Sequence, residues 1–261
     1  MKHLYGKNKG ENGKMKIKES PQQRIFNVFN VVFTFVLMVI MLYPMIHVLM
    51  ASFSDGEELI ASTGVLLWPK GFNLLAYQRA FENPAIFTGY QNTLFILIVG
   101  CCVNILLTTL GAYFLSSKGI MWKKPVSFLI IFTMFFGGGL IPQYLNVQNL
   151  GLLDSRWAVI LVGAISTYNM IIMRTGFDAV PDSLKEAAII DGAGHLTVLF
   201  KVMVPLALPT LAVILLYYGV GHWNSWFTES IYLNSPSKYP LQLVLRGILI
   251  VNDTTTMTQG V

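Results

Sequence analysis

The chain has 261 residues, of which 54% are hydrophobic and 12% charged, and its net charge is +5. An average soluble domain carries about 25% charged residues, so this composition excludes a globule whose main solvent is water. Much of the positive charge lies in residues 1–24, before the first apolar run. Because a hydrophobic segment follows and the sequence shows no folded basic groove, nucleic acid is excluded as a partner. We expect a basic cytoplasmic tail over 1–24 and one membrane domain over 25–261.

Five apolar stretches are long enough to cross a bilayer, whose core of roughly 30 Å needs about 20 apolar residues in a helix. They extend approximately over residues 25–50, 94–115, 126–145, 157–173 and 202–220. The third contains three glycines from Gly137 onward and then Pro142, which predicts a broken outer end. The pattern therefore predicts an all-α, polytopic membrane helix bundle.

The loops between these stretches alternate in charge, and positive residues in short loops favour the cytoplasmic side. The N-terminal tail, the loop with Lys118 and the segment 174–201 are basic, whereas the loops 52–90 and 143–156 are acidic or sparse in charge. We therefore expect a cytoplasmic N-terminus. The last apolar stretch, 241–251, is too short to span, and we expect it to be interfacial or re-entrant on the outer side.

Patterns typical of catalysis are missing from the sequence. The four histidines have no metal-ligand spacing, and there is neither a nucleophile elbow nor a phosphate-binding loop. Cys101 and Cys102 are adjacent within an apolar run and are interpreted as plain hydrophobes. The central turns of the five spans hold no ionisable carboxylate or base, which a proton- or sodium-driven transporter would be expected to keep there. Energy for uphill transport would have to come from another subunit.

The segment 180–201, between the fourth and fifth spans, has the pattern of a short cytoplasmic helix. Pro181 suits a first-turn position, and Ser183 with Glu186 has the form of a capping box. Gly192 falls where the helix is predicted to end. From periodicity alone, an ordinary amphipathic connector and a docking helix are equally good interpretations.

The residues themselves favour docking. Glu186-Ala187-Ala188, Gly192 and the run from Val202 to Pro205 resemble the EAA signature of binding-protein-dependent ABC importer permeases. Val202 and Val204 stand where the family pattern has Ile and Leu, and both departures are conservative.

Further likeness points to the carbohydrate branch of this family. The chain is similar to the second permease of the maltose system and to the permeases called LplC and YtcP. The first likeness rests on Asp191-Gly192-Ala193 and Pro209, and the second on three strings, Gly138–Pro142, Asn149–Asp154 and Tyr168-Asn169.

The resemblance implies a type I permease in a bacterial plasma membrane that forms half of the pathway for an oligosaccharide or polysaccharide fragment. The implied partners are a second permease, two ATPase subunits, an extracellular solute-binding lipoprotein and membrane lipid. The chain itself would be no enzyme and hold no cofactor, because ATP and Mg would be bound by the ATPase. Family members have six spans, so we expect the chain to stop before a sixth; the alternative is a missed span.

The resemblance also assigns residues to coupling with the ATPase. Glu186 would meet the ATPase surface, the alanines would permit close docking and Gly192 would supply a turn. The coupling set is Glu186, Ala187, Ala188, Asp191, Gly192 and Ala193.

Sugar sites favour aromatic faces together with amides or hydroxyls, so polar and aromatic residues within the spans are candidates for the solute pathway. Those favoured are Tyr168, Asn169, Trp223 and Asn224, and the wider set adds Asn104, Thr108, Tyr217 and Trp226. Helix-to-helix hydrogen bonds and interfacial aromatic belts are the alternative roles. For the whole chain, a membrane scaffold or receptor component and a membrane-embedded enzyme are the competing functions.

Overall fold

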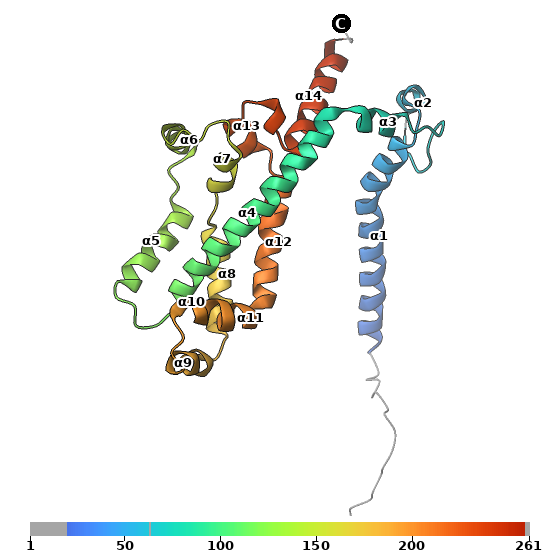
Figure 1. The fold of residues 1–261 in the computed structure, drawn as a ribbon. Coiled ribbons are helices and arrows are strands. Elements are labelled where there is room, and N and C mark those ends of the chain that lie inside the picture. The colour runs from blue at the N-terminus through green and yellow to red at the C-terminus, as the bar shows by residue number, and fades with distance from the viewer. Residues whose placement is uncertain (1–19, 63, 259–261) are drawn as a thin grey trace, which may run out of the picture. The chain divides into compact units, whose positions relative to one another are not determined.

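The computed structural model describes residues 20–62 and 64–258, with side-chain surroundings up to residue 250. Every regular element in this part is a helix, which confirms the predicted all-α class (Figure 1). Most of the predicted basic tail, residues 1–19, lies outside the described residues. The chain divides into two compact units, Met1–Arg79 and Ala80–Val261, and each is described by itself.

The first unit is dominated by the long helix α1 (Pro21–Ser52). Ser20 caps it by accepting a hydrogen bond from the Gln23 N–H, and no residue along the helix is buried. An apolar helix of this length with all faces exposed is covered by lipid when it spans a bilayer. Two short helices follow, α2 (Gly56–Ala61) and α3 (Leu75–Glu82).

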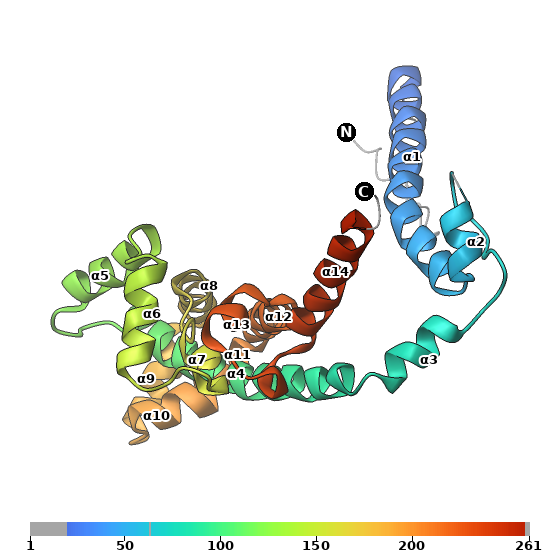
Figure 2. The ribbon, with the colours of Figure 1, turned by 90° about the horizontal axis from the view of Figure 1, so that it is seen from above.

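The second unit is organised around α4 (Pro84–Ser116), which packs against α8 (Thr167–Asp178), α12 (Leu208–Asn224) and α14 (Leu241–Thr258) (Figures 1 and 2). The buried face of α4 is formed largely by small and polar residues, among them Asn92, Thr93, Gly100, Asn104, Thr108 and Ala112. Small residues let membrane helices approach closely, and polar ones hydrogen-bond across the contact. The core of the unit therefore lies along α4.

Two of the predicted spans are bent. The helix axis bends by 113° between α5 (Lys123–Phe135) and α6 (Leu140–Asn149). Gly139 between them has a φ of 85°. The break in the third span is therefore confirmed. The fifth also bends, because α10 (His195–Val198), the π-helical turn η1 (Leu199–Met203) and α11 (Val204–Leu206) meet α12 at 87°.

The fourth predicted span, 157–173, is not one continuous helix, and this part of the prediction was wrong. Helix α7 (Arg156–Leu161) ends early and α8 begins at Thr167, after Ser166 has capped its N-terminus. Gly163 between them has a φ of 108°, which a continuous helix does not allow. Among the described helices, two are long and apolar enough to cross a membrane, or up to four if each bent pair counts as one span.

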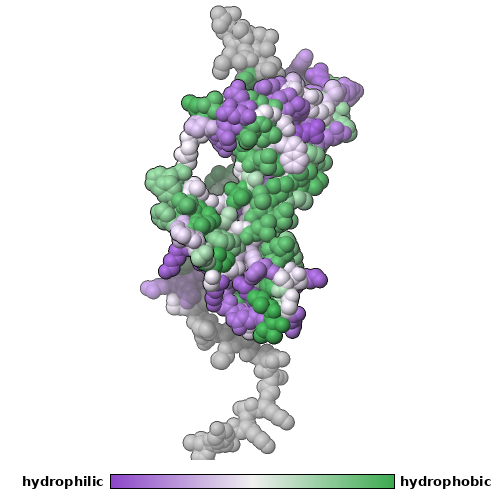
Figure 3. Space-filling view, turned by 60° about the vertical axis from the view of Figure 1, so that its left-hand side comes forward, coloured by the Kyte–Doolittle hydropathy of each residue, from purple (hydrophilic) through white to green (hydrophobic). Residues whose placement is uncertain are grey.

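The C-terminal elements are α13 (Phe227–Tyr232), the 3₁₀ turn η2 (Pro236–Lys238) and α14. Only the first ten residues of α14, Leu241–Ile250, form an apolar stretch, and this is too short for a span by itself. On the face in Figure 3, hydrophobic residues form a band between polar residues at either end, the distribution that a bilayer requires.

We expect Gly176→Ala to destabilise the bundle. A Cβ at Gly176 would lie 2.7 Å from Oγ1 and 2.8 Å from Cβ of Thr210, a side chain too short to swing aside. Overpacking of this kind costs about 1–3 kcal/mol, so the melting temperature of the purified complex should fall by several degrees. Gly247→Ala is the control, because it is also helical but has nothing within 4 Å of the added Cβ. Equal melting temperatures for the two variants would contradict this packing.

Candidate functional site

The predicted docking helix exists as α9 (Asp182–Ile190). Pro181 occupies the N-cap position, and no side chain caps the helix there. The predicted capping box of Ser183 and Glu186 is therefore wrong. The reason is that the helix begins two residues earlier than a cap at Ser183 would place it, which puts Ser183 inside the first turn, where Asp182 adds a favourable negative charge.

The helix ends as predicted, at the glycine. Gly192 has a φ of 82°, and its N–H donates to the Ile189 carbonyl at 3.0 Å. The Ala193 N–H reaches back to the Ala188 carbonyl at 2.9 Å, which completes a Schellman-type end. Only glycine adopts this left-handed conformation without steric cost, so Gly192 fixes the direction in which the chain leaves α9.

The predicted coupling residues divide between two faces. Glu186, Ala187, Asp191 and Gly192 are exposed. Ala188 and Ala193 are partly buried and pack against the hydrophobic core of the second unit. The two inward alanines therefore allow α9 to lie close to its own bundle, while the other four positions face outward.

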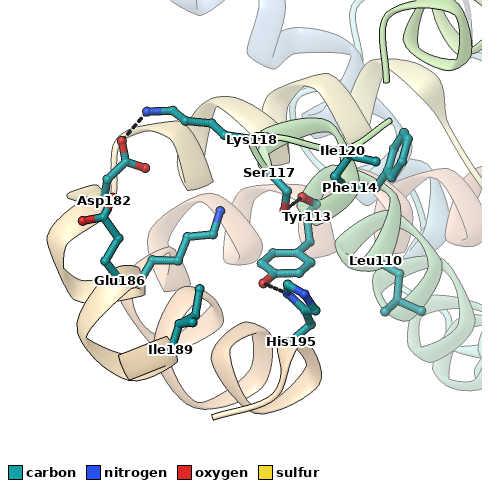
Figure 4. Close-up of a pocket in the computed structure, with 11 residues that line it drawn as sticks. Leu110, Tyr113, Phe114, Ser117, Lys118, Ile120, Asp182, Glu186, Ile189 and His195 are labelled. Atoms are coloured by element: carbon teal, nitrogen blue, oxygen red, sulfur yellow. Dashed lines mark hydrogen bonds and ion pairs between the residues drawn. The ribbon is translucent and has the colours of Figure 1, made fainter. Parts of the chain in front are cut away.

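A groove of 370 Å³ lies between α9, α10 and the C-terminal end of α4 (Figure 4). Lys118 donates to Asp182 across it, and the Tyr113 hydroxyl lies 3.3 Å from Nδ1 of His195. The hydrogen bond from Lys118 lowers the pKa of Asp182, and the same contact raises the pKa of Lys118. The first residue of α9 is thus tied to Lys118, just beyond α4, and the first residue of α10 is tied to Tyr113 in the last turn of α4.

On the C-terminal side, the segment continues without a loop into the bundle. The chain runs from α10 through the π-helical turn and α11 to the bend before α12. Val198, Leu199 and Met203 are buried at 0–2% exposure and anchor this path in the core. Displacement of α9 can therefore be transmitted to α12 and, through the Lys118 contact, to α4.

The structure does not bring the four favoured pathway residues together. Tyr168 is 55% exposed on α8, next to the buried Asn169. Trp223 and Asn224 end α12, where the Trp223 ring lies 6.4 Å from that of Tyr90. In the described residues, no hydrogen bond or ring contact joins the pair on α8 to the pair on α12.

Of the wider set, three residues are engaged in contacts. Asn104 bonds to the Gly163 carbonyl and to His222, and the Thr108 hydroxyl lies 2.7 Å from that of Tyr218. The guanidinium carbon of Arg246 lies 3.3 Å from the centroid of the Trp226 ring, in a cation–π contact.

The sequence reasoning missed two polar groupings. Glu229 is 1% exposed and hydrogen-bonds to Ser225, close along the chain to His222. The only signal was a lone acidic residue in an aromatic stretch. Asp154 accepts from Ser235 and Lys238, more than eighty residues away, a pairing that no local pattern reveals.

Residues 13–258 match the family described as "Binding-protein-dependent transport system inner membrane component". The chain belongs to this family. It is thus a permease component of binding-protein-dependent transport systems, with the membrane location and type I permease fold of that family.

Individual permeases agree with this assignment. The chain is 40% identical to the polygalacturonan/rhamnogalacturonan transport system permease protein YtcP of Bacillus subtilis (strain 168), covering 89% of this chain and 81% of YtcP. It is 38% identical to the protein LplC of the same organism, covering 89% and 78%. A solved bacterial ABC transporter involved in import of the acidic polysaccharide alginate contains a chain that superimposes with a TM-score of 0.85 at 35% identity, covering 89% and 82%.

Proposed function

We propose that the chain forms half of a transmembrane pathway for an oligosaccharide, together with a second permease, and couples to separate ATPase subunits through α9. A solute-binding lipoprotein would deliver the sugar, and ATP and Mg would be bound by the ATPase alone. The support for a sugar is the similarity to permeases whose names specify polysaccharides.

The single observation that carries the coupling role is the construction of α9. Four of the six EAA-segment positions face outward. The first residues of α9 and α10 contact Lys118 and Tyr113 at the C-terminal end of α4, and α10 continues through η1 and α11 to α12. Exposed apolar side chains extend the outward surface, with Ile190 84% and Leu196 65% exposed. A partner that binds this surface gains burial energy and can move the bundle as a rigid body.

The test is the ATPase activity of the complex purified with the products of neighbouring genes in lipid nanodiscs. We expect stimulation by the binding protein loaded with one oligosaccharide from a panel, and none by the unloaded binding protein. A chain that purifies without an ATPase would contradict the coupling role. If the ATPase is stimulated instead by binding proteins loaded with amino acids or peptides, the proposal that the transported solute is a sugar is contradicted.

A further inference from the structure

A polar cavity lies at the α13 end of the second unit, opposite α9 in Figure 1. It has a volume of 200 Å³ and is lined by parts of α4, α12, α13 and the segment after α7. Its polar and aromatic lining residues are Asn104, Tyr217, Tyr218, His222, Ser225, Thr228 and Glu229. Asn104 and Tyr218 hydrogen-bond to other parts of the core, whereas the Glu229 carboxylate receives a side-chain hydrogen bond only from Ser225 among the described residues.

Hydrogen bonds hold the imidazole of His222 in one pose. The Asn104 Nδ2 donates to the Gly163 carbonyl at 3.2 Å, so Oδ1 is the atom that faces His222 Nε2 at 3.1 Å. A carbonyl oxygen only accepts, so Nε2 donates, and in the neutral imidazole Nδ1 is then an acceptor. Gly100 makes room for the ring, because a Cβ there would lie 2.7 Å from Nε2.

Glu229 is the second fixed acceptor. It is 1% exposed and accepts a hydrogen bond from the Ser225 hydroxyl at 2.7 Å, yet it has no ion pair with any described Lys or Arg. A carboxylate can accept about four hydrogen bonds, so Glu229 can accept further hydrogen bonds from a ligand in the cavity. Burial of such a group is costly unless further donors satisfy it. A ligand with hydroxyl donors would satisfy the remaining acceptor positions.

We propose that this cavity binds one uncharged pyranose ring of the transported sugar, with Glu229 and Nδ1 of His222 accepting from its hydroxyls. The half-exposed ring of Tyr217 would pack on the C–H face of the sugar. The volume of 200 Å³ corresponds to about seven molecules of liquid water, the scale of a single ring rather than an extended chain. This inference rests on the proposed function and specifies the chemistry of one subsite.

The preference for an uncharged ring follows from Glu229. Glu229 is buried and forms no ion pair with a described Lys or Arg, so a uronate carboxylate placed against its carboxylate is disfavoured, because two like charges at one site repel each other. A ring with a hydroxymethyl group in place of the uronate carboxylate carries no such penalty and adds a donor.

The test is saturation-transfer NMR on the full complex in nanodiscs without binding protein, using methyl galactopyranoside and methyl galactopyranosiduronate as probes. They differ only in the group at C6. For the wild type, we expect signal from the galactoside to exceed that from the uronate by about tenfold, the equivalent of one pKa unit of charge interaction. Glu229→Gln should bring the two signals within about twofold, because the charge is lost and the shape kept. The matched exposed variant, Glu57→Gln, should leave the ratio unchanged.

Tyr217→Ala provides a second readout, because it should weaken both signals and preserve their ratio. The proposal is overturned if the wild type gives no galactoside signal, or if the signals persist unaltered in both Glu229→Gln and Tyr217→Ala, since they would then arise from the partner permease. Should Glu229→Gln not assemble, an unchanged galactoside signal in Tyr217→Ala alone overturns it. Failure of the proposed function is distinct, because it is measured as the absence of stimulation by a loaded binding protein.

Discussion

Replacing Gly192 with tryptophan should leave the complex assembled and uncouple its ATPase from the loaded binding protein. The φ of 82° at this position is costly for any bulky residue, by about 1–3 kcal/mol, and relief of that strain would redirect the chain between α9 and α10. The indole would also stand on the outward face of the segment. Because each 1.4 kcal/mol is a factor of ten, we expect transport to fall at least about tenfold. Transport and stimulated ATPase activity should be measured on the same preparation.

Gly192→Asn is the matched control for this experiment. Asparagine tolerates the left-handed region better than other side chains, so the end of α9 should keep its geometry. Nothing lies within 4 Å of a Cβ at Gly192, so space inside the chain does not forbid either variant. We expect the asparagine variant to retain most of the coupling. Normal transport by the tryptophan variant would contradict the coupling role, and equal losses in both variants would contradict the importance of the backbone conformation.

The sequence predicted those parts of the fold that depend on local chemistry. The turn at Gly192 and the break near Gly139 both depend on glycine, whose access to positive φ can be inferred from the sequence alone. The interruption between α7 and α8 escaped notice, because Gly163 is a single glycine in an otherwise apolar run and isolated glycines are tolerated in helices. The N-cap of α9 was misplaced by two residues because Ser183 is a better capping residue than Pro181 in isolation.

The candidate sites were less accessible to sequence reasoning than the helices. The EAA segment is continuous in sequence, and its six positions were found by resemblance, but which of them face inward depends on packing against the core. The cavity residues Asn104, His222 and Glu229 lie on three different helices. They come together only in the tertiary structure, and a single sequence contains no local pattern that predicts this.

Asp154→Ala should release the loop between α13 and α14. The Asp154 carboxylate accepts from the backbone N–H groups of Asn234 and Ser235 at 3.0 and 2.9 Å, from the Ser235 hydroxyl at 2.6 Å and from Lys238 Nζ at 2.7 Å. Alanine removes both carboxylate oxygens, which leaves two backbone donors without this partner, while Lys238 keeps only the backbone carbonyl of residue 154. We expect amide hydrogen exchange over residues 233–239 to accelerate by at least about tenfold, since lost hydrogen bonds to a charged group contribute about 1.5–3 kcal/mol in typical proteins.

Lys238→Met separates the ion pair from the backbone contacts. Partly exposed ion pairs contribute little, so this variant should exchange almost as slowly as the wild type. The donors around Asp154, Lys238 first, lower its pKa well below the usual range. A lowered pKa gives stability that is present above the unfolded value of about 3.9 and lost only as the pH falls through the folded value. Protection of this loop should therefore be constant between about pH 5 and 8, and a loss within that window would mean that a different group holds it.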